Sequence, residues 1–201
     1  MMTHVIPTEV ETHRQPEHEI NPQFLTRWSP RSFKDQEVPE DVLLSLFEAA
    51  RWAPSGGNLQ PWRYIIARTA EERAKFHTFI AAGNREWCEN APVLAVVISY
   101  TQTANGNPNS SHAFDAGASW GYLALESANQ GLITHAMGGF DREAARTTLQ
   151  IPAEYDIHAV IAIGYRGPVE ALAEKFQERE VPSGRKSVNE FVFTGDFGKT
   201  F

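Results

Sequence analysis

The chain changes from a helix to a strand across residues 53–64, which read Ala53-Pro54-Ser55-Gly56-Gly57-Asn58-Leu59-Gln60-Pro61-Trp62-Arg63-Tyr64. An amphipathic pattern ends at Pro54, because a proline forces the residue before it out of the helical region. An apolar run begins at Trp62. Between the two prolines stand a hydroxyl, two glycines and two side-chain amides, which can bring bare backbone and planar hydrogen-bonding groups close to a flat molecule. We interpret this stretch as a ligand loop.

The segments on either side of the loop carry clear signals. A helix is predicted over residues 38–53, where Pro39 suits the first turn and the apolar positions form one stripe. A strand is predicted over residues 62–67. Thr69 then opens a capping box for a helix that runs to about residue 82.

Later segments complete an α+β pattern. The nearly all-apolar run 92–99 predicts a strand buried on both faces. Ser111 is a candidate cap for a long helix that ends at Gly131, and Asp141 is a candidate cap for a helix to residue 149. We also predict a polar loop at 101–111 and three β segments, at 132–137, 156–165 and 189–193.

The sequence shows no repeat and no linker, so one domain is predicted over residues 21–201. Residues 1–20 are interpreted as a mobile N-terminal arm or a strap over a neighbour. Histidines 4, 13 and 18 leave a metal site as an alternative. Pro16 separates the last two of them and breaks helical spacing, so no metal site is predicted.

Composition excludes several classes of function. The 201 residues carry a net charge of −7, which predicts no basic surface for nucleic acid. No apolar run approaches about 20 residues, so no membrane span is expected. Cys88 is the sequence's one cysteine, which favours a reducing cytoplasm, and we expect it to be a core residue rather than a nucleophile. The stretch 195–200 lacks the spacing of a P-loop, and no Rossmann glycine motif follows a strand.

A second polar segment precedes the first helix. Residues 27–33 read Arg27-Trp28-Ser29-Pro30-Arg31-Ser32-Phe33. Two guanidinium groups and two hydroxyls within six residues suit an anion, because arginine binds phosphate through two parallel hydrogen bonds. An exposed basic turn explains the same composition.

Four motifs of the chain resemble those of the FMN-dependent nitroreductase family and occur in the family's order. They are Arg27-x-Ser29-x-Arg31, Pro54-Ser55-x-x-Asn58-x-Gln60-Pro61-Trp62, Met137-Gly138-Gly139-Phe140-Asp141 and Gly184-Arg185-Lys186-Ser187. The resemblance covers roughly residues 22–195. By the resemblance, Arg27 and Ser29 bind the flavin phosphate, Arg31 reaches the pyrimidine edge, and Asn58 hydrogen-bonds the polar edge of the ring. Backbone at 137–139 approaches flavin N5, and a C-terminal basic motif closes on the phosphate. The cofactor-binding residues that the resemblance implies are Arg27, Trp28, Ser29, Arg31, Pro54, Ser55, Asn58, Gln60, Met137, Gly138, Gly139, Arg185 and Lys186.

The resemblance also implies a fold and an activity. The fold is a three-layer sandwich with a central mixed β-sheet flanked by helices, and two chains form an intertwined homodimer. FMN is the bound cofactor, NAD(P)H is the electron donor, and a nitroaromatic or quinone-like small molecule accepts electrons by ping-pong hydride transfer. No side chain is expected to act as acid, base or nucleophile.

Three alternatives stay open. The chain can be an FMN enzyme of the same fold with a different reaction, such as dehalogenation or dehydrogenation. It can be a flavin-binding protein without useful turnover. In the third alternative, the arginines are surface charges and bind no flavin.

Overall fold

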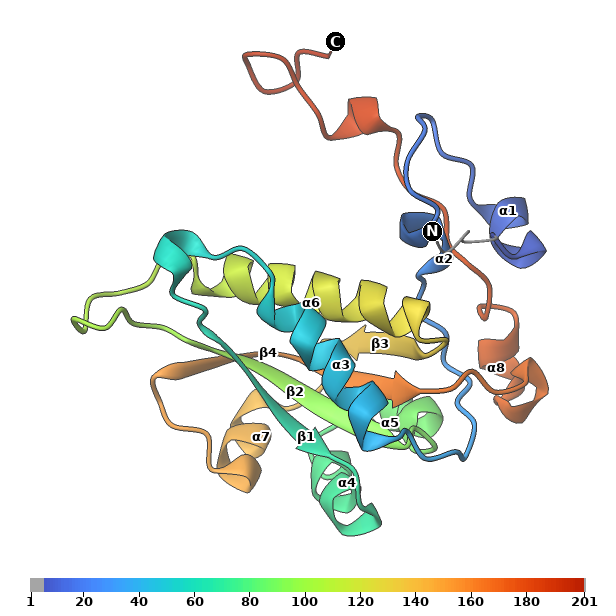
Figure 1. Ribbon diagram of the computed structural model, residues 1–201. Coiled ribbons are helices and arrows are strands. Elements are labelled where there is room, and N and C mark those ends of the chain that lie inside the picture. The colour runs from blue at the N-terminus through green and yellow to red at the C-terminus, as the bar shows by residue number, and fades with distance from the viewer. Residues whose placement is uncertain (1–5, 201) are drawn as a thin grey trace.

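A computed structural model describes residues 6–200, and their helices and strands form three layers (Figure 1). Residues 1–5, including His4, and Phe201 lie outside the described part. The helices are α1 (Thr8–His13), α2 (Gln23–Thr26), α3 (Glu40–Arg51), α4 (Ala70–His77), α5 (Ala82–Cys88), α6 (His112–Asn129), α7 (Arg142–Leu149) and α8 (Glu174–Gln177). The strands are β1 (Trp62–Ala67), β2 (Val93–Tyr100), β3 (Ile133–Met137) and β4 (Tyr155–Gly164).

The four strands form one sheet in the order β1-β2-β4-β3. Each of its three pairings is antiparallel, so the prediction of a mixed sheet is wrong for the described chain. The helices α4 and α5 join β1 to β2, and α7 joins β3 to β4. Each connection leaves and re-enters the sheet at the same end, which reverses the strand direction instead of carrying the chain back for a parallel pair. The predicted α+β class is confirmed.

Two hydrophobic cores cover the two faces of the sheet. On β2, Val93, Ala95 and Val97 face the core shared with α3 and α6, while Leu94 and Val96 face the core on the other side. Successive side chains of a strand point to opposite faces, so an all-apolar strand suits a middle layer. The predicted two-sided burial is confirmed.

The segment after β1 differs from its prediction. The capping box at Thr69 is present, since its side chain accepts from Glu72 N and the Glu72 side chain accepts from Thr69 N. The helix, however, ends at His77 instead of near residue 82. Ile80 leaves the helix because it forms a β-bridge with Phe140, and Ala81 N donates to Gly139 O at 3.1 Å.

Of three other local predictions, one holds in part, one is wrong and one is confirmed. Ser111 is the N-cap residue of α6, as predicted, but its side chain accepts no cap hydrogen bond, and its one hydroxyl proton is shared between Asn109 Oδ1 and Asp115 Oδ2. The predicted β segment at 189–193 contains a 3-10 helix, η3 (Val188–Glu190), whose start is held by a capping box between Ser187 and Glu190. The cap predicted at Asp141 is confirmed, since its carboxylate accepts from Ala144 N at 3.0 Å.

The two terminal segments lie beside each other and project from the layered body (Figure 1). The N-terminal segment contains α1, which the sequence did not predict, and Val10 of this helix is buried. Glu17 accepts hydrogen bonds from Ser187 Oγ and Val188 N, which join the two segments. The arm of residues 1–20 therefore has defined contacts over its described part.

Cys88 lies at the end of α5 and is fully buried. Burial raises the pKa of its thiol to about 12, which suppresses the thiolate form needed for a nucleophile. The prediction of a core cysteine is confirmed. Among residues 6–200, no helix combines the length and hydropathy needed to cross a bilayer.

Candidate functional site

The first part of the candidate site is a half-buried arginine beside a hollow at the sheet edge. Arg27 follows α2, and its guanidinium donates to Ser29 Oγ at 3.3 Å. Both side chains face a hollow of about 420 Å³ between the segment 24–29, α6 and Ala136 of β3. Small residues of α6, Gly121 and Ala124, line the opposite wall and leave this space open.

Arg185 approaches the same region from the C-terminal segment. Its guanidinium donates to Gly184 O at 2.8 Å and to Ser183 O at 3.2 Å. Burial lowers the pKa of Arg27, and the positive charge of Arg185 lowers it further. Within residues 6–200 neither arginine has an ion-pair partner. The structure thus brings Arg27 of the first predicted motif near Arg185 of the last one, and no described acidic side chain pairs with either charge.

Arg31 is held by a buried carboxylate that the sequence did not single out. Glu180 Oε1 accepts from the backbone N–H groups of Arg31 at 2.7 Å and Ser32 at 2.9 Å. The Arg31 guanidinium lies 3.9 Å from Glu180 Oε2 and donates to Arg179 O. Burial lowers the pKa of Arg31, as does the charge of Arg179, whereas Glu180 opposes both effects.

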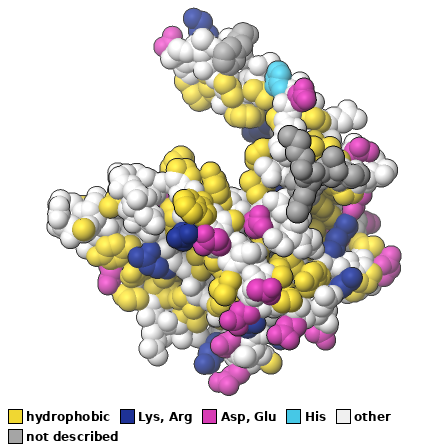
Figure 2. All heavy atoms as spheres, in the orientation of Figure 1, with side chains coloured by type: hydrophobic (Ala, Val, Ile, Leu, Met, Phe, Trp, Pro, Cys, Tyr) yellow, Lys and Arg dark blue, Asp and Glu magenta, His cyan; other side chains and the backbone are white. Residues whose placement is uncertain are grey.

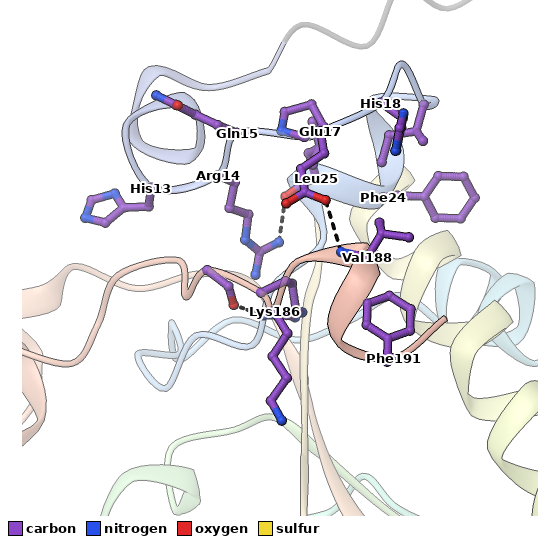
Figure 3. A pocket seen from close by; sticks show the side chains of 14 residues that line it. His13, Arg14, Gln15, Glu17, His18, Phe24, Leu25, Lys186, Val188 and Phe191 are labelled. Atoms are coloured by element: carbon purple, nitrogen blue, oxygen red, sulfur yellow. Dashed lines mark hydrogen bonds between the residues drawn. The ribbon is translucent and has the colours of Figure 1, made fainter. Parts of the chain in front are cut away.

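The other basic-motif residues are placed differently. Trp28 lies against Arg166, whose guanidinium carbon is 4.8 Å from the ring centroid and whose nitrogens pair with both carboxylate oxygens of Glu9. Lys186 lines a cavity of about 710 Å³ between the two terminal segments, and its side chain extends away from the arm (Figure 3). Their predicted contacts with a flavin stay predictions.

The end of β3 presents exposed backbone. Met137 is buried, whereas Gly138 and Gly139 are exposed. A Cβ on Gly139 would lie 2.6 Å from Asn84 Nδ2, so the Asn84 amide, which donates to Gly139 O, would have to move aside. A Cβ on Gly138 would meet no described atom within 4 Å. The chain's own packing gives no reason for glycine at 138, which leaves its backbone open to a ligand.

The loop of residues 54–60 is compact and strained. Ser55 Oγ accepts from Gln60 N at 3.1 Å, and Gln60 Nε2 donates to Asn58 Oδ1 at 3.0 Å. Asn58 and Gln60 have φ values of 56° and 47°, in a region that side chains other than glycine adopt infrequently. Such strain is often found at functional sites.

This loop lies away from the arginines within one chain. Gly56 N donates to Asp115, near the start of α6, while the hollow beside Arg27 is lined by residues 120–125 of that helix. The rise of 1.5 Å per residue separates these positions by roughly 10 Å along the axis. Figure 1 shows the loop and the segment 27–31 toward opposite ends of α6. Pro54, Ser55, Asn58 and Gln60 are therefore not brought together with Arg27 in one chain.

His135 supports the segment 27–31 from β3. Its Nδ1 lies 3.0 Å from Pro30 O and donates to it, and its ring lies 4.4 Å from the Trp87 ring. Burial lowers the pKa of His135 to about 4, and the charge of Arg31 contributes in the same direction. The imidazole is therefore neutral in the folded protein at neutral pH.

We expect this neutral histidine to make stability fall with acid. Below about pH 6.5 the unfolded chain takes up a proton at His135 that the folded chain does not, until the pH reaches the folded pKa of about 4. The free energy of unfolding should fall by about 2 kcal/mol from this group between about pH 7.5 and pH 5. Urea unfolding across this range measures it. His135→Gln should flatten the dependence; a slope equal to that of the unmodified protein would contradict the assignment.

Fold and site together define a three-layer α+β protein with a cationic hollow at the sheet edge. The sequence model of the nitroreductase family matches residues 25–86 and 74–165. The chain belongs to the nitroreductase family, as the sequence predicted.

Individual relatives agree with this assignment. A Thermus thermophilus protein named NADH dehydrogenase is 30% identical in an alignment 173 residues long, and the match covers 70% of this chain and 83% of that protein. A crystal structure of an oxidoreductase containing FMN has a TM-score of 0.89 and 38% identity, and covers 93% of this chain and 97% of its own. A nitroreductase family protein from Streptococcus pneumoniae TIGR4 shares the fold, with a TM-score of 0.67 and 22% identity over 84% of this chain and 96% of its own.

Proposed function

We propose that the protein is an FMN-dependent oxidoreductase that takes electrons from NAD(P)H and passes them to a nitroaromatic or quinone-like acceptor. The observation that carries the proposal is the pair Arg27 and Arg185, which converge without an ion-pair partner within residues 6–200. The FMN-containing oxidoreductase that is 38% identical to this chain supports the choice of cofactor. The single cysteine supports a cytoplasmic location.

The residues present fit the phosphate of FMN. A phosphate monoester carries a charge of about −1.5 to −2 near neutral pH, by analogy with phosphorylated side chains. The Arg27 guanidinium and the Ser29 hydroxyl offer matching charge and donors at one hollow, and Arg185 is close enough for its charge to lower the pKa of Arg27. The open backbone at Gly138 fits close approach by a flat ring.

Each site residue then has a distinct role. When bound, FMN supplies hydride transfer at N5. Arg27, Ser29 and Arg185 hold its phosphate and fix its register. Arg31, kept in place by Glu180, directs positive charge at the pyrimidine edge, where reduction places negative charge. Gly138 leaves room at N5, so no side chain blocks the donor or acceptor.

A second copy of the chain would supply the loop 54–60 in this proposal. The separation of Asn58 from Arg27 along α6 leaves a one-chain site incomplete. Large hydrophobic side chains are exposed on α6 and on the C-terminal segment, at Phe114, Tyr122 and Phe191. Figure 2 shows hydrophobic side chains along the projecting segment and on the upper face of the body. Light scattering should give a dimer, whereas a monomer that binds FMN with full affinity would contradict this arrangement.

Spectroscopy of the purified protein tests the proposed activity. We expect a flavin absorbance band that bleaches when NADH or NADPH is added without oxygen, and that returns when a nitroaromatic or quinone is added. A bound flavin that stays oxidised with both donors would show that the proposed reaction is wrong. Product analysis separates nitroreduction from dehalogenation and dehydrogenation.

We expect Arg31→Ala to lower the midpoint potential of bound flavin. Loss of one charge-assisted hydrogen bond, worth about 1.5–3 kcal/mol, corresponds to roughly 30–60 mV for a two-electron couple. Potentiometric titration measures the shift. Arg146→Ala is the control, because Arg146 binds backbone carbonyls between α7 and β4. An unchanged potential in Arg31→Ala would remove Arg31 from its proposed role.

A further inference from the structure

A buried arginine in the N-terminal arm joins the two basic motifs. Arg14 follows α1, and only 9% of its surface is exposed. Its Nη1 donates to Leu25 O at 2.7 Å and to Arg27 O at 2.8 Å, and its Nε donates to Ser183 O at 3.1 Å. Figure 3 shows Arg14 extending from the arm toward Leu25. Three of its five donors are thus used to hold the backbone of segments far apart in sequence.

Arg14 also brings a third positive charge to these segments. Ser183 O accepts from both Arg14 and Arg185, so their guanidinium groups share one acceptor. Burial lowers the pKa of Arg14 to about 10, and the charges of Arg185 and Arg27 contribute in that order. The charges of the three arginines therefore repel one another in the folded chain.

The described acidic residues leave this charge unbalanced. Glu17 lines the same cavity as Arg14, but its carboxylate accepts from Ser187 and Val188. Within residues 6–200 Arg14 forms no ion pair. A buried cation without a counter-charge is costly unless an anion binds nearby.

We propose that Arg14 is a positioning residue of the phosphate site, which fixes the Arg27 and Arg185 segments against each other and adds a third positive charge. The inference rests on the proposed function, since it concerns the phosphate of FMN. It assigns a role to the N-terminal arm, which lies before the four motifs. Arg14 acts through the carbonyls of Arg27 and Ser183, so its effect should depend on whether the ligand carries a phosphate.

Binding of FMN and of riboflavin to flavin-free protein tests the proposal. Riboflavin has the same ring and lacks the phosphate, so it separates an effect at the phosphate from general damage. We expect Arg14→Met to weaken FMN binding by about tenfold or more and to change riboflavin binding by less than about twofold. Arg14→Lys keeps the positive charge and loses hydrogen bonds, so its FMN affinity should lie between those of the unmodified protein and Arg14→Met. Arg146→Met is the matched control, because Arg146 also donates to three backbone carbonyls, those of Ile151, Pro152 and Tyr155.

The outcomes distinguish this proposal from a purely structural arginine. Equal losses for FMN and riboflavin in Arg14→Met, or full FMN affinity, would overturn it. If Arg14→Met does not fold, the same comparison is made with Arg14→Lys, and unchanged discrimination between the two ligands is the contrary result.

A second readout does not need flavin. Inorganic phosphate should raise the melting temperature of the unmodified protein and should raise that of Arg14→Lys less. If the unmodified protein binds no FMN but phosphate still stabilises it through Arg14, the proposed function fails and the anion site stands. If neither ligand acts on the unmodified protein, both proposals are wrong.

Discussion

Glu180→Ala is expected to lower the free energy of unfolding by about 4 kcal/mol. Glu180 is 3% exposed, and its Oε1 accepts hydrogen bonds from both Arg31 N and Ser32 N. Each buried N–H left without an acceptor costs about 1–3 kcal/mol, and the half-buried Arg31 guanidinium also loses its nearest negative charge. Chemical denaturation at neutral pH measures the change.

Glu180→Gln separates the acceptor from the charge. Its amide oxygen can still accept from both backbone N–H groups, so we expect a smaller loss of about 1 kcal/mol. In the proposed function this variant should lower the fraction of correctly oriented Arg31 and weaken FMN binding. A Glu180→Ala protein as stable as the unmodified one would show that the buried carboxylate does not hold this segment.

Gly167→Ala should be almost as disruptive, with a loss of about 3 kcal/mol. A Cβ at this position would lie 2.9 Å from Phe33 C and Phe33 O and 2.8 Å from Ser32 Oγ. Two of these atoms are backbone, which cannot rotate aside. The segment 32–34 is also bonded here, since Gly167 N donates to Ser32 O and Lys34 N donates to Tyr165 O. The added methyl group must push the segment that carries Arg31 away from the end of β4.

Gly83→Ala is the matched control for this substitution. Gly83 lies in α5, and a Cβ there would meet nothing within 4 Å among the described residues. We expect no loss, and up to about 1 kcal/mol of gain, because alanine favours a helix. Thermal stability and FMN binding should both be reduced in Gly167→Ala and not in Gly83→Ala. Equal behaviour of the two variants would contradict the close packing at Gly167.

The layers of the fold could be predicted because their signals are local. The run of apolar residues in β2 requires cover on both faces, whatever the rest of the chain does. The strand directions could not be predicted in the same way, because they depend on how α4 and α5 return the chain to the sheet. The end of α4 depends on the bridge between Ile80 and Phe140, a contact between distant segments that no window around Ile80 contains.

In the candidate site, too, the residues with a local sequence signal could be predicted and the others could not. Arg27, Ser29 and Arg185 stand in short motifs, and the structure brings them to one region. Arg14 and Glu180 have no such signal, because they form hydrogen bonds to backbone groups, which are the same in every sequence. A buried charge is visible only when the fold is known. The proposal that a second copy supplies the loop 54–60 rests on a distance along α6, which the sequence also does not contain.

The burial of Cys88 has a practical consequence for spectroscopic work. Because a thiol with a pKa of about 12 is almost entirely protonated near pH 8, maleimide and nitroxide reagents should leave the native protein unmodified. A new cysteine on the exposed Thr200 or Asn189 would then carry the label alone. In the proposed dimer, one label on each copy would give the distance between the two copies, with no need to remove the native thiol first.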